Sequence, residues 1–357
     1  MNRCYFEKTM DFFYNNSHNQ NQECTAAPDW SGTPLIIVLC FGSFFCLFIF
    51  LSNVMVIAAV IINKRFHFPF YYLLANLAAA DFFAGIAYVY LMFNTGPVSA
   101  TLTVHWWFVR QGLLDTSLSA SLANLLVIAL ERYISVMRMK VHSNLTKRRV
   151  IFLIVLVWAV SILMGAVPSL GWNCICSLDV CSVLAPVYSR SYLIFWSVSN
   201  LVVFLIMLVI YLRIYLYVKK KTIVLSSHTN GSISRRRTPI KLMKTVMTVL
   251  GAFVICWTPG LVLLLLDGLH CTHCKLCSVK RWFLLLALLN SAMNPIIYSY
   301  KDEEMWNTFK NILRYIFCRK NDAMVSRANL RALSSSIDNG SRYNDESQAS
   351  FREGLKA

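Results

Sequence analysis

Charged residues are scarce in this sequence: of 357 residues, 14% are Asp, Glu, Lys or Arg, while 57% are hydrophobic. A soluble protein of this length would carry roughly a quarter charged residues. The first thirty residues contain no apolar segment before a small-residue cleavage site, so we expect no cleavable signal peptide. We find no zinc-binding helix motif, nucleophile elbow or P-loop, and therefore expect neither an enzyme nor a cofactor.

Apolar segments of sufficient length recur seven times, since crossing a bilayer needs about 20 mostly apolar residues. They cover 34–62, 68–93, 105–137, 150–172, 187–218, 241–267 and 281–300. Hydropathy alone would most easily miss the seventh, which is the shortest and contains Asn290, Asn294 and Pro295. We therefore expect an all-α membrane protein with a seven-transmembrane-helix bundle at 34–300, after an extracellular segment at 1–33.

A short eighth helix is predicted beyond the bundle. Apolar residues recur there at helical spacing, which is typical of a helix lying in the membrane interface. They are Met305, Phe309, Ile312 and Ile316. We expect this amphipathic helix at 301–317 and a disordered cytoplasmic tail at 318–357.

The formal net charge is +17. On a soluble protein this excess would suggest nucleic acid as a partner. Here the basic residues lie beside the apolar spans, so orientation in the lipid bilayer explains them better and we expect no nucleic-acid partner. Lys and Arg are frequent after spans one, three, five and seven, absent from 94–104 and 173–186, and number two at 268–280. The positive-inside tendency predicts an extracellular N-terminus and a cytoplasmic C-terminus in the plasma membrane.

Eight of the twelve cysteines fall on the predicted outer side, where an oxidising compartment favours disulfides. They are Cys4, Cys24, Cys174, Cys176, Cys181, Cys271, Cys274 and Cys277. The run 270–277 (HCTHCKLC) can alternatively be interpreted as a metal-binding knuckle. We also expect glycosylation at Asn15 in the sequon 15–17 (NNS), and palmitoylation at Cys318 after the amphipathic stretch.

Asp81 lies near the middle of span two, where an ionisable side chain is costly and is a functional candidate by default. One interpretation is a small-cation site, for sodium, formed by Asp81, Ser121, Asn290 and Asn294. The other is a purely structural network of hydrogen bonds. Both interpretations require spans one, two, three and seven to meet.

Motifs at helix ends and kinks indicate a switch between two conformations. Within 131–133 (ERY), Arg132 can pair with Glu131 or turn toward another partner; alternatively, it is an ordinary Arg that extends into solvent at a helix end. Pro259 and Pro295 each remove a backbone hydrogen bond and kink their spans. The switch we expect comprises Glu131, Arg132, Tyr133, Tyr211, Trp257, Pro259 and Tyr298.

The ordered motifs resemble those of the rhodopsin-like G-protein-coupled receptors. They are Asn53, 77–81 (LAAAD), 131–133 (ERY), Trp158, 256–259 (CWTP) and 294–298 (NPIIY), on six spans within 34–317. Further segments resemble the lysophosphatidic acid receptors: 66–69 (FHFP), 78–85 (AAADFFAG), 93–97 (FNTGP) and 171–174 (GWNC). The segments 10–15 (MDFFYN) and 231–239 (GSISRRRTP) are most similar to subtype 3 of that family.

Two departures from the general receptor pattern support the narrower resemblance. Trp107 stands where most such receptors have a cysteine, and Val203 stands where many have proline. In the lysophospholipid branch the second outer loop closes on itself, which implies the disulfides Cys4–Cys176, Cys174–Cys181 and Cys271–Cys274. Cys24 and Cys277 then remain, and we expect a further bridge, Cys24–Cys277.

The resemblance implies a lysophospholipid ligand, which has a phosphate head and one acyl chain. Arg110 precedes Arg132 by 22 residues, about 33 Å of helix, so the two lie at opposite faces of the membrane. Arg110 can surround the phosphate together with Arg190 at the start of span five and Lys280 and Arg281 at the start of span seven. Alternatively, the last three anchor their helices among lipid head groups.

Gln111 separates two related ligands. The sphingosine 1-phosphate receptors, which are the nearest relatives of this branch, carry Glu here and pair it with an ammonium group. Gln is neutral and can hydrogen-bond a glycerol hydroxyl or ester, which favours lysophosphatidic acid. Asp115 shares a helix face with Gln111, and we expect it to orient the basic cluster. Below them, the expected apolar pocket contains Leu114, Leu118, Trp196, Trp257, Gly260, Leu261, Leu264 and Leu288; leucines on spans can equally be core or face lipid.

The resemblance also implies heterotrimeric G proteins of the Gq and Gi types as partners, with a rise in cytosolic calcium. The basic segment 213–244 and the stretch 303–317 flank the expected inner mouth. Phosphorylated serines in the tail can recruit arrestin, unless the tail is only a passive solvated segment; they are Ser334, Ser335, Ser336, Ser341, Ser347 and Ser350. The main rival is a transporter, which would usually show internal repeats, and we find none.

Overall fold

The structure is a computed structural model. It describes residues 33–94, 102–137, 146–177, 180–185, 187–226, 237–271 and 276–317, with the backbone alone at 33–35, 38, 221–226, 237–246, 276–282, 284 and 285. The chain divides into two units, Met1–Met305 and Trp306–Ala357. Seven long helices lie in the described part of the first unit, as predicted. They are α4 (Thr33–Ile62), α5 (Pro69–Phe93), α6 (Val104–Met137), α7 (Lys147–Ala166), α8 (Arg190–Ser226), α9 (Arg237–Gly268) and α10 (Leu276–Lys301).

Several helix ends differ from the predicted span limits for local reasons. α7 begins at Lys147 rather than 150, because the Thr146 side chain caps it by accepting the Arg149 amide at 3.4 Å. It ends at Ala166 rather than 172, because Pro168 lacks an amide donor and Gly171 has a φ of +138°. α8 continues to Ser226, beyond the predicted limit of 218, because a helix can extend past the apolar stretch that crosses the bilayer.

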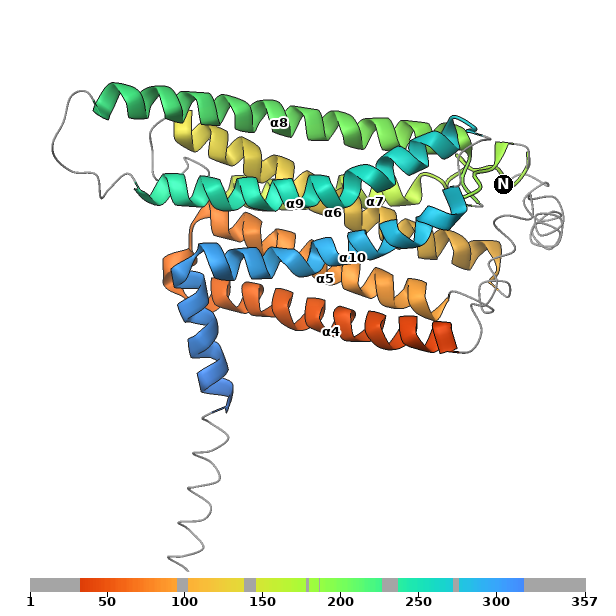
Figure 1. Ribbon diagram of the computed structural model, residues 1–357, viewed down its shortest axis with the longest axis horizontal. Helices are drawn as coiled ribbons and strands as arrows, with labels where there is room; N and C mark the ends of the chain where they lie inside the picture. The colour runs from red at the N-terminus through yellow and green to blue at the C-terminus, as the bar shows by residue number, and fades with distance from the viewer. Residues whose placement is uncertain are drawn as a thin grey trace, which may run out of the picture. The chain divides into compact units, whose positions relative to one another are not determined.

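The seven helices run side by side, with α6 in the middle of the bundle (Figure 1). α4 packs against α5 and α10, and α9 packs against α8 and α10. α6 contacts α5, α7, α8 and α9, so residues on α6 can communicate with most of the bundle. Close packing of α6 on α7 depends on two glycines: a Cβ on Gly112 would lie 2.8 Å from the Gly165 carbonyl oxygen.

Many large apolar side chains are exposed on the outside of the bundle, while several polar side chains are buried inside it. Phe41, Phe152 and Leu205 are 64%, 66% and 62% exposed, whereas Asn53 and Asp81 are fully buried. Such outward apolar surface suits lipid rather than water. Among the described residues, six helices are long and apolar enough to cross a membrane; α10 is not one of them, in line with the weak hydropathy predicted for the seventh span.

Residues 303–317 are helical, which places the short helix predicted at 301–317 two residues later. Asp302 separates it from α10 and caps it, because its Oδ1 accepts the amides of Glu304 at 3.1 Å and Met305 at 3.3 Å. Other predictions lie outside the described residues, or on residues whose backbone alone is described. The first group is Cys4, Asn15, Cys24, Cys274, Cys318, the tail serines and the segments 1–32 and 318–357; the second is Cys277, Lys280 and Arg281.

Candidate functional site

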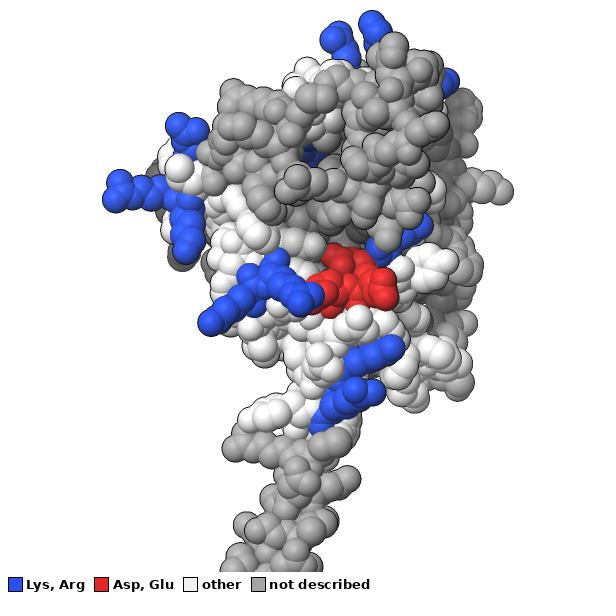
Figure 2. Space-filling view, turned by 90° about the vertical axis from the view of Figure 1, so that its left-hand side faces the viewer, with Lys and Arg blue, Asp and Glu red and all other residues white. Residues whose placement is uncertain are grey.

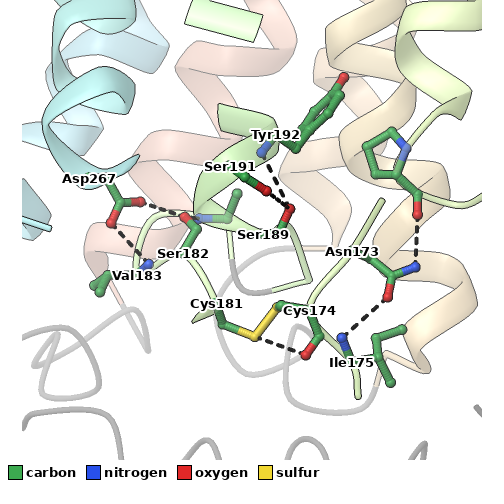
Figure 3. The surroundings of a disulfide bond; sticks show 12 residues. Asn173, Cys174, Ile175, Cys181, Ser182, Val183, Ser189, Ser191, Tyr192 and Asp267 are labelled. Carbon is green, nitrogen blue, oxygen red and sulfur yellow. Dashed lines mark hydrogen bonds between the residues drawn. A yellow bond between two sulfur atoms is a disulfide. The ribbon is translucent and has the colours of Figure 1, made fainter. Parts of the chain in front are cut away.

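The connection between α7 and α8 closes on itself through the predicted Cys174–Cys181 disulfide, whose Cα atoms are 5.2 Å apart (Figure 3). We call the end of the bundle that contains it the disulfide end. Cys176 and Cys271 are also disulfide-bonded, and their predicted partners lie outside the described residues. Since Cys271 is oxidised, it is not a thiolate ligand, and the metal-knuckle interpretation of 270–277 is wrong.

Arg110 is buried near the disulfide end of α6, with 6% of its surface exposed. Its Nη1 donates to the carbonyl oxygen of Asn94 at 2.8 Å, and its guanidinium lies 3.6 Å from the centroid of the Trp107 ring. Neither described ion pair includes Arg110, and its Nε has no partner among the described residues. The site therefore holds a fixed, desolvated cation that can still receive an anion.

Gln111 and Asp115 follow on the same helix face and contact each other, as their spacing predicts. Gln111 Nε2 donates to Asp115 Oδ1 at 3.4 Å, while the other carboxylate oxygen accepts the Tyr188 hydroxyl at 2.8 Å. Burial, and then the neighbouring Asp115 carboxylate, raise the pKa of the Tyr188 phenol, so it remains a donor. Asp115 thus orients Gln111 and Tyr188; the described contacts do not connect it to Arg110, so the expected role in orienting the basic cluster is not seen.

Asp267, at the end of α9, was not among the predicted residues. Its carboxylate accepts the Ser182 hydroxyl and, at 3.2 Å, the Val183 amide (Figure 3). It also accepts the Leu184 amide at 3.0 Å. It is 2% exposed and joins α9 to the α7–α8 connection. Two of its three partners are backbone amides some 84 residues away, so no side-chain pattern in the sequence could reveal them.

Several residues that were predicted to line an apolar pocket lie inside the bundle. Leu118, Trp196, Leu261 and Leu288 are all buried, and Leu114 and Trp257 pack against the core cluster that includes Leu288. Gly260 faces α10, since an added Cβ would lie 3.8 Å from Phe283. A shallow apolar groove of about 500 Å³ instead opens on the outward face of α9, and none of the predicted pocket residues lines it. Its walls are Val254, Ile255, Thr258, Pro259, Val262, Leu263, Leu266 and Phe283.

Asp81 is fully buried and bonded to two other helices. Ser121 Oγ donates to its Oδ1 at 3.3 Å, and Asn294 Nδ2 donates to its Oδ2 at 2.7 Å. On α4, Asn53 Nδ2 donates to the Ser291 carbonyl oxygen at 3.2 Å. Spans one, two, three and seven therefore meet here, as both interpretations of Asp81 required.

Three buried amide oxygens on α4 and α10 accept no hydrogen bond from the described residues. The side-chain oxygens of Asn53, Asn290 and Asn294 are buried without a hydrogen-bond partner among the described residues. Buried oxygens of this kind, beside a carboxylate, suit a hard cation. A neighbouring chain of bonds is complete: Asn76 donates to Asn124 at 2.6 Å and accepts the Trp158 indole N–H at 3.0 Å, which is structural.

The opposite end of the bundle, which we call the Arg132 end, holds a buried ion pair. Arg132 donates to both carboxylate oxygens of Glu131, through Nε and through Nη2 at 2.6 Å. Its guanidinium also lies 4.3 Å from the Phe70 ring centroid, and Ser135 Oγ donates to Glu131 at 3.1 Å. Arg132 is 6% exposed, so it does not extend into solvent as the alternative interpretation required.

Figure 2 looks onto the Arg132 end and shows acidic side chains gathered in one patch, with Lys and Arg around it. The acidic run 302–304 holds this edge together: Glu304 accepts from Arg65 at 3.0 Å and from Asn63 at 3.3 Å, and Asp302 accepts the Tyr71 hydroxyl at 3.0 Å. The pair of Arg65 and Glu304 is exposed and contributes little free energy. It marks where the first connection meets the end of α10.

The remaining switch residues lie inside the bundle. Pro259 is inside α9 and Pro295 is inside α10, and the Trp257 ring lies 6.1 Å from Phe253. Tyr211 and Tyr298 are buried, and Tyr133 is half-buried. The Trp257 indole N–H and the Tyr298 hydroxyl have no partner within the described part of the chain. Arg190 begins α8 and is half-buried at the disulfide end.

Comparison with known proteins agrees with this arrangement. Residues 52–298 match the family of 7 transmembrane receptors (rhodopsin family). The chain is 68% identical to lysophosphatidic acid receptor 3 of Homo sapiens over 97% of both chains, and equally similar to that of Rattus norvegicus. It is 54% identical to lysophosphatidic acid receptor 1 of Homo sapiens over 87% of this chain and 84% of the relative. The chain therefore belongs to the rhodopsin family of seven-transmembrane receptors and, within it, to the lysophosphatidic acid receptors, which are not enzymes.

Proposed function

We propose that this chain is a receptor that binds lysophosphatidic acid and activates heterotrimeric G proteins of the Gq and Gi types, raising cytosolic calcium. The observation that carries the proposal is the state of Arg110. Its guanidinium is buried and fixed by Trp107 and the Asn94 carbonyl, yet it forms no described ion pair. A buried cation without a counter-ion is costly, and a lipid phosphate would supply the missing charge.

Gln111 supports lysophosphatidic acid over an amine-bearing lipid. Its amide is neutral and held by Asp115, so it can offer hydrogen bonds to a glycerol hydroxyl or ester. The alternative ligand, sphingosine 1-phosphate, carries an ammonium that this side chain cannot neutralise. A transporter is no longer a rival, because the chain belongs to a receptor family.

Lys280 and Arg281 on α10, together with Arg190 on α8, are the further cations that we assign to the phosphate. Arg190 begins α8, and Lys280 and Arg281 lie in the second turn of α10. The candidate sodium site is assigned to Asp81, Ser121, Asn290 and Asn294, supported by the buried amide oxygens there. Tyr133, Tyr211, Trp257, Pro259 and Tyr298 are assigned with Glu131 and Arg132 to the activation switch.

The disulfide end is proposed to face the outside of the cell and the Arg132 end the cytoplasm. The alternation of basic connections supports this orientation. The same orientation suits glycosylation of Asn15, palmitoylation of Cys318 and arrestin binding to the phosphorylated tail. It also suits the outer disulfides Cys4–Cys176, Cys271–Cys274 and Cys24–Cys277.

The test is a calcium assay in cells that do not respond to lysophospholipids, with the full chain expressed at a measured surface density. We expect a response to lysophosphatidic acid and none to lysophosphatidylcholine, whose choline group the neutral Gln111 amide cannot neutralise. Arg110→Ala should abolish the response, while surface labelling stays normal. Nucleotide exchange on purified Gq and Gi in separate membranes tests the coupling. An undiminished response of Arg110→Ala would refute the proposed phosphate site.

A further inference from the structure

The described loop residues 182–185, 187 and 188, which we call the segment 182–188, share hydrogen bonds of their own. Ser182 N–H donates to the Tyr188 carbonyl at 2.9 Å, and Tyr188 N–H donates to the Ala185 carbonyl at 2.9 Å. The Ala185 amide donates to Ser182 Oγ at 2.7 Å. The disulfide at Cys181 restrains one end of the segment. Because the bonds cross the segment, a displacement of one end moves the other.

Two buried carboxylates on different helices hold this segment. Asp267 of α9 accepts the Ser182 hydroxyl and the amides of Val183 and Leu184. Asp115 of α6 accepts the Tyr188 hydroxyl at 2.8 Å. Asp115 in turn contacts Gln111 at 3.4 Å. A continuous chain of contacts therefore runs from the end of α9, through the loop, to the residue that faces the proposed head group.

We propose that Asp267 is a positioning residue for head-group recognition, acting through the segment 182–188 on the Asp115–Gln111 pair. The inference rests on the proposed function, because it assumes that Gln111 faces a lysophospholipid. Asp267 touches no ligand. It fixes where Tyr188 presents its hydroxyl, and Tyr188 fixes which oxygen of Asp115 remains for Gln111.

The charge and shape of Asp267 suit this role and those of Asn do not. Three donors converge on its two oxygens, and bonds to an ionised acceptor are stronger than bonds to a neutral one. An Asn side chain has one oxygen and would turn its NH₂ group toward at least one donor. The side chain at this position is 2% exposed, so water cannot readily replace a lost hydrogen bond.

The first arm of the test needs no ligand. Hydrogen exchange is measured on the purified full chain for the amides of Val183 and Leu184, in wild type and Asp267→Asn. The Val183 amide donates to Oδ1 and the Leu184 amide to Oδ2, and Asn keeps one oxygen, so we expect exchange to accelerate about tenfold or more at one of the two amides at least. Tyr192→Phe is the matched control: it keeps the ring that packs against Tyr188, with the two ring centroids 5.1 Å apart, and removes only a hydroxyl that bonds the Met164 carbonyl at 2.7 Å, so it should leave the exchange unchanged.

The second arm measures the lysophosphatidic acid concentration for half-maximal response at matched surface density. Asp267→Asn and Tyr188→Phe should each raise this half-maximal concentration about tenfold. The double variant should need no higher concentration than the more impaired of the two single variants. Tyr192→Phe should respond as wild type. Should Asp267→Asn fail to reach the surface, Ser182→Ala replaces it in both arms. This variant removes the hydroxyl that donates to Asp267 and accepts the Ala185 amide, so the first arm then follows exchange of the Ala185 amide.

The inference is overturned if Asp267→Asn accelerates loop exchange without changing the response, or if the effects of the two single variants multiply in the double variant. If exchange at the Val183 and Leu184 amides is unchanged in Asp267→Asn, Asp267 does not hold the segment 182–188 in place. Failure of the proposed function looks different: the wild-type chain then gives no response to lysophosphatidic acid, although Asp267→Asn still loosens the loop.

Discussion

The Arg110 guanidinium lies 3.6 Å from the centroid of the Trp107 ring, one helical turn earlier on α6. Residues three apart on a helix share a face, so the ring can lie against the guanidinium of Arg110. Trp107 stands where most rhodopsin-like receptors have a cysteine, and this contact gives the departure a physical reason. The indole face holds the guanidinium plane in place and leaves the N–H groups at the edge of that plane able to donate hydrogen bonds.

We expect Trp107→Leu to raise the lysophosphatidic acid concentration for half-maximal response by about 2- to 30-fold, the range of a cation–π contact of about 0.5–2 kcal/mol. Trp107→Phe keeps an aromatic face and should lose less. Both variants are compared at equal surface density. Equal losses for Leu and Phe would mean that Trp107 supports the fold and not Arg110.

Gln111→Glu should reverse the ligand preference. The new carboxylate would lie beside Asp115, whose Oδ1 is 3.4 Å from the present Gln111 amide nitrogen. Two adjacent carboxylates repel each other and attract an ammonium, so we expect a gain in response to sphingosine 1-phosphate and a loss for lysophosphatidic acid. Dose–response curves for both lipids provide the measurement. An unaltered preference would remove Gln111 as the discriminating residue.

The sequence predicted the helices well because a long apolar segment in a bilayer must satisfy its backbone hydrogen bonds internally, which a helix does. It placed Asn53, Asp81, Ser121 and Asn294 on helices that must meet, and they do. The limits of α7 were less accurate, because a capping side chain at Thr146 and a proline decide them locally. The pairing of Cys174 with Cys181 came from family resemblance, since spacing alone leaves several pairings open.

The structure adds contacts that depend on backbone geometry far apart in the chain. The partners of Asp267 are amides of the α7–α8 connection, and every residue type except proline offers an amide. The hydrogen bond between Asp115 and Tyr188 is similar. The sequence shows both residues, but only the fold brings the Tyr188 hydroxyl within 2.8 Å of the Asp115 carboxylate. Leucines on spans do not by themselves reveal whether they pack in the core or line a cavity, so the sequence offered the apolar pocket as one of two interpretations.

Breaking the Glu131–Arg132 pair should activate the receptor without ligand. Glu131→Gln removes the charge that holds Arg132, and Arg132 is then free to turn toward another partner. We expect basal nucleotide exchange to rise about 5-fold or more, which corresponds to a shift of about 1 kcal/mol between two states. Ser135→Ala is the control, since it removes only the hydroxyl that donates to Glu131 at 3.1 Å. A basal rate equal to wild type would argue against a switch at this pair.

Asp81→Asn should abolish any effect of sodium on the receptor. A cation bound among Asp81, Asn290 and Asn294 would stabilise the conformation in which Arg132 pairs with Glu131, and linkage then opposes the agonist. We expect replacement of Na⁺ by N-methylglucamine to improve agonist affinity about fivefold in wild type and to have no effect in the variant. If wild type is indifferent to sodium, the network around Asp81 is purely structural.

Gly165→Ala should destabilise the bundle. A Cβ at Gly165 would overlap the Thr116 hydroxyl and the Gly112 carbonyl oxygen, so α7 would have to move away from α6. Overpacking of this kind costs about 1–3 kcal/mol, and the loss should appear as a lower melting temperature of the purified chain and lower surface expression. Gly251→Ala is the matched control, since no atom lies within 4 Å of its added Cβ and alanine is the better helix former. If both variants melt alike, the contact of α6 with α7 tolerates a methyl group, and the two glycines have another role.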